Sequence, residues 1–491
     1  MRFLKRGQEY FWIGVLYLLS RIIFLTKLPV FADEAIYIRW AQVGLNEPEK
    51  YNLLSMLDGK PPLHNWLIKP FLFIFNDPLF SGRFLSVLAG GFTLFFGYKI
   101  LKDIFKKDDL VQKGLILMIL QPFWIIHHRL ALAESILALF FTTSWFYANK
   151  AIKSKKIKHT VLFGLSWGLS LWTKTNAIFF IPAYLIIPFL FTKKPTIKKL
   201  IVNYSRLLVG GVVGGLLFLT LKSSELFPFL FSRSQDYTFS ISEIIKGEWR
   251  FVLFTTIPRV FKWIIWYITP TAFLLSFYER NKNKLLSVGL LTYFSPLILL
   301  GRVLSPRYFF PVSVLIVIMV LNGIKESQKN KIDKRIANIL FQTTLGFSLF
   351  FSMMFIFRPN NTPFVAADRK QYLEDWSSGH GIPNVRDFVS ERIKETKVVV
   401  ATEGFFGTLP DGLIMYFDKS EHINNLEMYG IGLPINGVSQ DLREKTKDAE
   451  VYIVGNSHRV DLSTSQNVQK IGEYERPNKA PSLQLFKVNQ L

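Results

Sequence analysis

The sequence predicts a polytopic α-helical membrane protein with a C-terminal extracytoplasmic domain of mixed α/β structure. Half of the 491 residues are hydrophobic, 47 of them are Phe, and the mean hydropathy is positive, which is unusual for a soluble chain. The formal net charge is +23. Residues 1–357 hold 43 Lys and Arg against 18 Asp and Glu, whereas residues 358–491 hold 16 against 18. The positive excess therefore belongs to the apolar part, which argues against a nucleic-acid partner.

Apolar runs of roughly twenty residues are long enough to cross a membrane as helices. They predict eleven spans, at about 9–28, 82–101, 113–128, 131–149, 159–173, 176–192, 205–222, 258–278, 285–300, 306–324 and 336–357.

Lys and Arg collect in alternate connections between these spans, for example at 102–113, 150–158 and 325–335. Cytoplasmic loops of membrane proteins carry such an excess. We therefore expect a multi-pass protein of the cell membrane whose N-terminus is cytoplasmic and whose C-terminal domain is extracytoplasmic.

Two domains are expected: a transmembrane module at 1–357, with a first external loop at about 29–81, and an external α/β domain at 358–491. Within the second, residues 397–401 (KVVVA), 450–454 (EVYIV) and 483–488 (LQLFKV) have strand composition, and 439–447 is typical of a helix. The chain has no Cys, which excludes disulfides, thiolate metal sites and a Cys nucleophile.

Two acids open the first external loop, at Asp33 and Glu34. Ile36, Trp40 and Val43 follow at helical spacing, so the acids are expected to begin a short amphipathic helix on the membrane surface. Further along the same loop comes GKPPLHNWL, residues 59–67, which contains Lys60 and His64. Acids and a cation on one side of the membrane point to an enzyme that handles a phosphate-bearing substrate.

Other ionisable residues lie at the external ends of predicted spans, where charge is costly. Any one of them is most simply a membrane anchor, but together they place several cations and carboxylates on one face. They are His127, His128, Arg129, Glu134, Lys174, Arg302 and Arg307, with Tyr308 beside the last.

Five segments carry a resemblance to a known family: FADEAIYIRWAQ, GKPPLHNWL, HRLALAES, GLSLWTKTNAIFFIPA and SPRYFFPV. Over residues 10–325 the chain resembles bacterial GT-C glycosyltransferases of the protein-mannosyltransferase and lipid A aminoarabinose transferase type. The resemblance implies an inverting transfer of sugar from a polyprenyl-phosphate donor to a hydroxyl of a lipid, glycan or protein, at the outer face of the membrane.

On this basis Asp33 is expected to be the general base, and Glu34 to orient it, to bind the acceptor or to cap the helix. Lys60 is the first choice for the donor phosphate, with Lys174, Arg307 and Tyr308 as companions. Lesser candidates for that phosphate are Arg129 and Arg302. Glu134 is a candidate to join Asp33 around a divalent ion, with His64, His127 or His128 completing the shell. Relatives often carry Asp at the position of Glu134, and this departure argues against metal coordination there.

Three alternatives remain at this point. One is a transferase that uses a lipid-pyrophosphate oligosaccharide, and another is an inactive scaffold for an envelope complex. The third is a secondary transporter for an anionic substrate, which would normally have two repeated halves and ionisable groups at mid-membrane. The sequence has no such repeat, and it has no nucleotide-binding Gly-rich loop.

Overall fold

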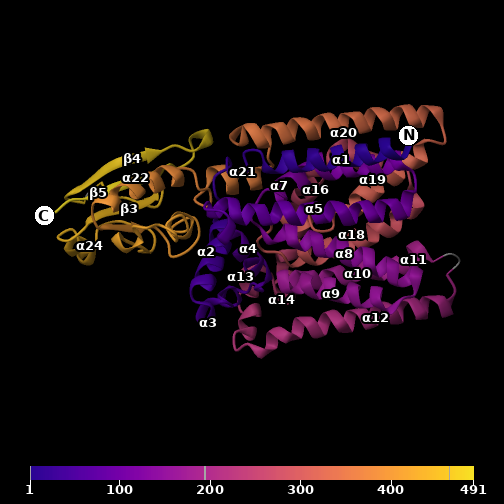
Figure 1. The fold of residues 1–491 in the computed structure, drawn as a ribbon, viewed down its shortest axis with the longest axis horizontal. Coiled ribbons are helices and arrows are strands. Elements are labelled where there is room, and N and C mark those ends of the chain that lie inside the picture. Colours follow the sequence, from indigo (N-terminus) through magenta and orange to yellow (C-terminus); the bar gives the residue numbers. More distant parts are fainter. Residues whose placement is uncertain (1, 193–194, 464, 491) are drawn as a thin grey trace. The chain divides into compact units, whose positions relative to one another are not determined.

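A computed structural model describes residues 2–192, 195–463 and 465–490, which fall into two compact units. The first unit contains residues 2–23, 53–64 and 84–358, and the second contains residues 24–52, 65–83 and 359–490. The ribbon is drawn in Figure 1. Each unit is described by itself below.

The first unit is helical. Its longer helices are α1 (Arg2–Ile22), α6 (Asp108–Leu120), α8 (Ala133–Ser154), α9 (Ile157–Thr173), α12 (Ile197–Leu219), α16 (Ile257–Ile268), α18 (Arg280–Leu300), α19 (Ser313–Ser327) and α20 (Lys331–Phe357), together with most of α5 (Pro78–Phe105). Shorter pieces include α7 (Pro122–His127), α17 (Pro270–Leu275) and the 3-10 helix η7 (Pro306–Phe309).

Five helices among the described residues are long and apolar enough to cross a membrane, namely Pro78–Phe105, Ile197–Ser223, Ile241–Ile268, Asn283–Leu300 and Lys331–Phe357. The chain is therefore a multi-pass membrane protein. All eleven predicted spans coincide with helical segments. Since the other segments are shorter or more polar, the count of eleven stays a prediction.

Several predicted spans differ from the helices that form. The span expected at 113–128 is interrupted at Gln121, between α6 and α7. The span expected at 176–192 is three short pieces, η2 (Thr175–Phe180), α10 (Ile181–Leu185) and α11 (Ile187–Phe191), because Pro182 and Pro188 each remove a backbone donor. The span expected from residue 258 begins at Ile241 instead and ends at Ile268. Thr269, with φ +75°, then breaks the helix before Pro270.

Glycines allow a close helix contact in this unit. Helices α9 and α12 lie side by side (Figure 1). A Cβ added to Gly164 would lie 2.3 Å from the Gly210 carbonyl oxygen, and one added to Gly214 would lie 2.7 Å from the Gly164 oxygen. Small residues allow this backbone approach, as is common between helices in membranes.

The second unit combines residues 24–52 and 65–83 with the C-terminal domain. It contains α2 (Ala32–Asn46), most of α4 (Leu63–Ile74) and the first six residues of α5. Residues just before α2 pair with the linker that precedes the C-terminal domain. The Ala32 N–H donates to the Ser377 oxygen (2.9 Å) and the Gly379 N–H donates to the Val30 oxygen (2.8 Å).

The C-terminal domain is built on a five-stranded mixed sheet of order β2-β1-β3-β5-β4. The strands are β1 (Val398–Thr402), β2 (Leu426–Gly430), β3 (Glu450–Asn456), β4 (Val468–Tyr474) and β5 (Leu483–Val488), and the helices are α22 (Ile382–Glu395), α23 (Asp411–Ile414) and α24 (Gln440–Lys445). Strand β1 pairs in parallel with β2 and β3, and β5 pairs antiparallel with β3 and β4. The three strands and the helix expected from sequence are confirmed.

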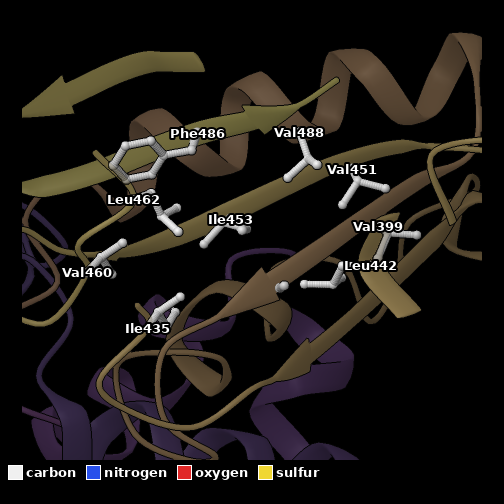
Figure 2. Packing of buried hydrophobic residues seen from close by; sticks show 10 residues of the cluster. Val399, Ile435, Leu442, Val451, Ile453, Val460, Leu462, Phe486 and Val488 are labelled. Atoms are coloured by element: carbon white, nitrogen blue, oxygen red, sulfur yellow. The ribbon is translucent and has the colours of Figure 1, made fainter. Parts of the chain in front are cut away.

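One hydrophobic cluster of this domain lies on one face of the sheet. Val399 and Val451 from the central strands pack with Leu442 of α24 and with Val488 of β5, as Figure 2 shows. All five residues of β1 are buried, as expected for a central strand covered on both faces.

Candidate active site

The first cluster of charged groups in the first unit surrounds Glu134. Its carboxylate is 2.6 Å from the Lys174 ammonium and 3.7 Å from Nε of Arg307. Glu134 is the second residue of α8, where a helix dipole favours a negative charge. Lys174 caps the end of α9 in an extended conformation, and Arg307 lies in η7 directly after Pro306. Two cations therefore share one buried carboxylate.

Tyr308 lies against both of these cations. Its ring centroid is 4.7 Å from Nζ of Lys174 and 5.4 Å from Cζ of Arg307, which are cation–π distances. Tyr293 fixes the backbone at this point by donating to the Tyr308 carbonyl (2.9 Å). The predicted group of Lys174, Arg307 and Tyr308 is thus brought together, with an excess of positive charge.

His127, the last residue of α7, adds a buried imidazole to this region. Its ring lies 4.7 Å from that of Phe310, and its backbone carbonyl accepts from the Ser135 hydroxyl. Within the part of the chain that the structure describes, neither ring nitrogen of His127 has a hydrogen-bond partner. Buried polar atoms are normally satisfied, so this imidazole has capacity for a ligand group.

The residues of the first unit that are predicted to hold a metal ion have other contacts in the structure, and the metal stays a prediction. Among residues 2–192, 195–463 and 465–490, no group of three His, Asp or Glu side chains could hold an ion. One oxygen of Glu134 is occupied by Lys174, Nε2 of His64 lies 3.3 Å from the Ala131 carbonyl oxygen, and the His128 ring packs edge-on against Trp124. No step is therefore assigned to a metal.

A second cluster of the first unit surrounds Asp58. Its carboxylate is 2.6 Å from Nζ of Lys60 and also pairs with Arg233. Gly59 between Asp58 and Lys60 has φ +73°, a left-handed turn that favours Gly. Lys60 is thus held in a second arrangement of two cations on one acid. The sequence analysis missed Asp58, although it lies two residues before Lys60, and it missed Arg233, for which the sequence carries no local signal.

Arg129 and Arg302 lie at other contacts. Arg129 is buried and donates to the carbonyls of Ser20, Arg21 and Ile23, each at 2.9 Å, so it caps the C-terminal end of α1. Arg302 pairs with Glu243 at 2.7 Å and is 41% exposed. These contacts do not include Glu134 or Asp58, so they do not connect Arg129 or Arg302 with either cluster.

Both predicted catalytic acids lie in the second unit, at the start of α2. Glu34 is fully buried, and Arg83 donates to its two oxygens from Nε (2.8 Å) and NH2 (2.7 Å). Glu34 also accepts from the Phe31 N–H (3.0 Å). Among the three roles expected for Glu34, the geometry matches the helix cap. Arg83, which the sequence analysis missed, donates further to the carbonyls of Leu25 and Leu28.

Asp33 is the half-buried neighbour of this fixed pair. It is the second residue of α2, and Asp and Glu are favoured in a first turn. Because Glu34 anchors the helix to α5 through Arg83, the backbone that carries Asp33 is held rigidly. The arrangement therefore provides one positioned carboxylate in the second unit. The first unit provides a cation-rich cluster at Glu134 and, at Asp58, a cluster in which Asp236 also pairs with Arg233.

The comparisons first define a class. Residues 59–220 match the family model of dolichyl-phosphate-mannose-protein mannosyltransferases. The expected resemblance to the GT-C superfamily is confirmed over this segment and by the fold. A search of curated proteins with the sequence finds no match.

Solved structures then give particular relatives. The fold is similar to that of ArnT from Cupriavidus metallidurans bound to undecaprenyl phosphate, with a TM-score of 0.58 and 10% sequence identity over 98% of this chain and 97% of ArnT. The apo structure of the same ArnT gives a TM-score of 0.57 and 10% identity over 96% of each chain. At this identity the likeness concerns the fold.

Proposed function

We propose that this protein is an inverting glycosyltransferase that moves a sugar from a polyprenyl-phosphate donor to an acceptor hydroxyl at the outer face of the membrane. The observation that carries the proposal is the cluster of Lys174 and Arg307 around the single carboxylate of Glu134. Its excess positive charge at the edge of the apolar helices suits a lipid-linked phosphate. The undecaprenyl phosphate in the ArnT structure supports the same ligand class.

The reaction in this proposal is a single displacement at the anomeric carbon. Asp33 accepts the proton of the acceptor hydroxyl, whose oxygen attacks that carbon, and general-base catalysis of this kind contributes about a hundred- to ten-thousand-fold. The bond from the anomeric carbon to the donor phosphate breaks, and the phosphate leaves with the electron pair. One displacement inverts the configuration of the sugar.

The leaving phosphate gains negative charge in this step, and the cations stabilise it. Lys174, Arg307 and Lys60 are each already held by a carboxylate, so their orientation costs little when the substrate binds. Fixed charges in a water-poor site stabilise developing charge more strongly than water does. Tyr308 keeps two of these cations together through its ring.

The orientation needed for this reaction follows from the distribution of cations. The N-terminus and the Lys-rich connections would face the cytoplasm, and the C-terminal domain would lie outside, where the lipid-linked sugar is consumed. The eleven spans predicted from the sequence give this arrangement.

A direct test uses the full-length protein in liposomes with two classes of radiolabelled donor. We expect polyprenyl-monophosphate sugars to transfer label to lipid, glycan or protein from membranes of a deletion strain, and to release polyprenyl phosphate. Label transfer only from a polyprenyl-pyrophosphate oligosaccharide would favour the larger donor instead. Uptake of an anionic solute without any transfer would favour a transporter and contradict the proposal.

A further inference from the structure

A loop of the C-terminal domain carries two protruding aromatic side chains. It connects β1 to α23, and within it Phe405 is 71% exposed and Phe406 is 60% exposed. Leu433, in the connection that follows β2, is 54% exposed and adjoins this loop. A Cβ added to Gly432 would lie 3.4 Å from the Phe405 ring, and one added to Gly404 would lie 3.7 Å from Leu433. Phe405 and Leu433 therefore lie close together, and Phe406 is the next residue along the chain. These three exposed residues are called here the Phe405 patch.

Hydrogen bonds hold the Phe405 patch in its exposed position. Gly404 donates to the Gly432 carbonyl (2.9 Å), and Gly407 donates to Oδ2 of Asp411 (2.7 Å). The two glycines have φ of +72° and +107°, conformations that side chains rarely allow. The loop is therefore built to turn outward between two fixed points.

Contacts within the second unit place this loop beside the start of α2. A Cβ on Gly407 would lie 3.8 Å from Cβ of Ala32, the first residue of α2. Two residues further, Glu34 is bonded to Arg83 of α5. The patch is thus joined, through one helix turn, to the first six residues of a helix that can cross a membrane.

The length of α5 shows the depth at which this junction lies. Its 28 residues extend about 42 Å at 1.5 Å per residue, whereas the hydrocarbon of a bilayer is about 30 Å thick. The excess must project beyond the hydrocarbon. Because the apolar run within α5 begins at about residue 82, the first turn of α5 is expected at the level of the lipid headgroups. Because the Glu34–Arg83 pair lies next to that turn, the loop beside α2 is close to the membrane surface.

The residue types beside the patch suit that surface. A Cβ on Gly407 would lie 3.4 Å from Trp376, and the Arg459 guanidinium lies 4.7 Å from the Trp376 ring centroid. Trp is enriched at the headgroup level of membranes, and the long side chain of Arg keeps its charge in water beside apolar surface. Small ligands bind in concave pockets, whereas Phe405 and Phe406 project. A bulk apolar phase fits this shape better than a substrate does.

We infer that the Phe405 patch inserts into the surface of the bilayer and anchors the C-terminal domain there, with Trp376 and Arg459 at headgroup level. The anchor would hold α2, and with it Asp33, at a fixed depth. The inference concerns a membrane contact and is independent of the transfer reaction.

The absence of natural Cys allows a test with single labels. Phe405→Cys and, separately, Leu433→Cys would be labelled with bimane in the full-length protein and reconstituted in phosphatidylcholine nanodiscs. Ile471→Cys on β4, a position that is 38% exposed, is the matched control. When a fraction of the lipid carries a doxyl group on its acyl chain, we expect bimane emission at positions 405 and 433 to fall at least twofold, and emission at position 471 to stay unchanged.

Equal quenching at positions 405 and 471 would overturn the inference. A second outcome would also overturn it: doxyl lipid does not quench the label at 405, but octyl glucoside monomers protect that label from quenching by iodide. The octyl glucoside would be added below its critical micelle concentration. That result would assign the patch to a soluble amphiphilic ligand. Each labelled protein must elute as wild type does, and because position 405 is exposed, its substitution is expected to leave folding intact.

Discussion

At the scale of single residues, the shared feature of the two cation clusters is that one carboxylate holds two positive side chains. Lys174 and Arg307 meet at Glu134, and Lys60 and Arg233 meet at Asp58. An ion pair with one cation and one carboxylate would have little positive charge left to attract an anionic ligand. The excess cation at Glu134 retains attraction for phosphate. In the Asp58 cluster Arg233 also pairs with Asp236 (3.0 Å), so a phosphate there would have to compete with two carboxylates for the cations.

Lys60 gives a direct test of this reading. Lys60→Met is expected to lower sugar transfer about a hundredfold, because one fixed stabilising group at a developing charge has an effect of this size. Lys60→Arg should retain part of the activity, since charge is kept while its geometry changes. Transfer from a polyprenyl-phosphate donor is the measurement. Lys246→Met, at an exposed position, is the control, and full activity of Lys60→Met would remove Lys60 from the site.

The buried Glu34–Arg83 pair predicts a folding defect. Arg83→Met leaves a buried carboxylate without its partner, which typically costs about 3–5 kcal/mol. We expect little folded protein by size-exclusion chromatography. The double variant Arg83→Met/Glu34→Leu should recover much of the folded fraction, because no unpaired charge remains. If the single and double variants were equally well folded, the pair would not have the structural role described.

Sequence reasoning found single residues well where chemistry is local and poorly where it depends on tertiary pairing. Lys174, Arg307 and Tyr308 stand out as ionisable or polar groups at the ends of apolar runs, and Lys60 stands out within GKPPLHNWL. Arg83 and Arg233 do not, because their partners lie 49 and 175 residues away and no spacing rule connects them.

At the scale of elements, the apolar runs predicted where helices form more reliably than where those helices begin and end. The helix that ends at Ile268 begins at Ile241, although Glu243, Lys246 and Glu248 make its first turns polar. The low hydropathy of these first turns gives no sign in the sequence that the helix starts before residue 258. The strands of the C-terminal domain were easier to predict, because KVVVA and EVYIV are short β-branched runs.

One prediction at this scale concerns Glu450, the first residue of β3. Glu450 accepts from Arg392 at 2.7 and 2.9 Å and from Tyr452 at 2.7 Å, and the hydrogen bonds from Arg392 are the main cause that lowers its pKa to about 2. Because the folded-state pKa is below the usual Glu value, this contribution to stability is present above about pH 4.5. It is lost as the pH falls toward 2.

Glu450→Gln should therefore weaken the attachment of α22 to the sheet by about 1 kcal/mol at pH 7. Amide hydrogen exchange of peptides from α22 and β3 in the full-length protein would become about fivefold faster. Glu421→Gln, an exposed position in the same domain, should leave these peptides unchanged. Equal exchange in both variants would contradict the stabilising role of Glu450.

At the scale of the whole molecule, the proposed reaction requires the C-terminal domain to lie on the outer side of the membrane. Reporter fusions after Lys158, Lys199 and Lys331 should report the cytoplasm, and a fusion at the C-terminus should report the outside. The positive-inside rule is the physical reason. A cytoplasmic C-terminus would place the proposed chemistry on the wrong face of the membrane.

The central claim is that Asp33 is the base of a sugar transfer, and one variant separates this role from a structural one. Asn is nearly isosteric with Asp and cannot take a proton, so Asp33→Asn should lower turnover at least a hundredfold. A carboxylate that only supports the first turn of α2 should be replaced by Asn with little loss, since Asn is also accepted near helix starts.

The measurement is the turnover of purified Asp33→Asn in liposomes with a polyprenyl-phosphate sugar donor, at wild-type protein level and membrane insertion. Asp387→Asn, at an exposed position of α22, controls for the loss of one negative charge. The account predicts near-complete loss of transfer in Asp33→Asn with unchanged donor binding. Transfer at the wild-type rate would contradict the assignment of Asp33 as the base.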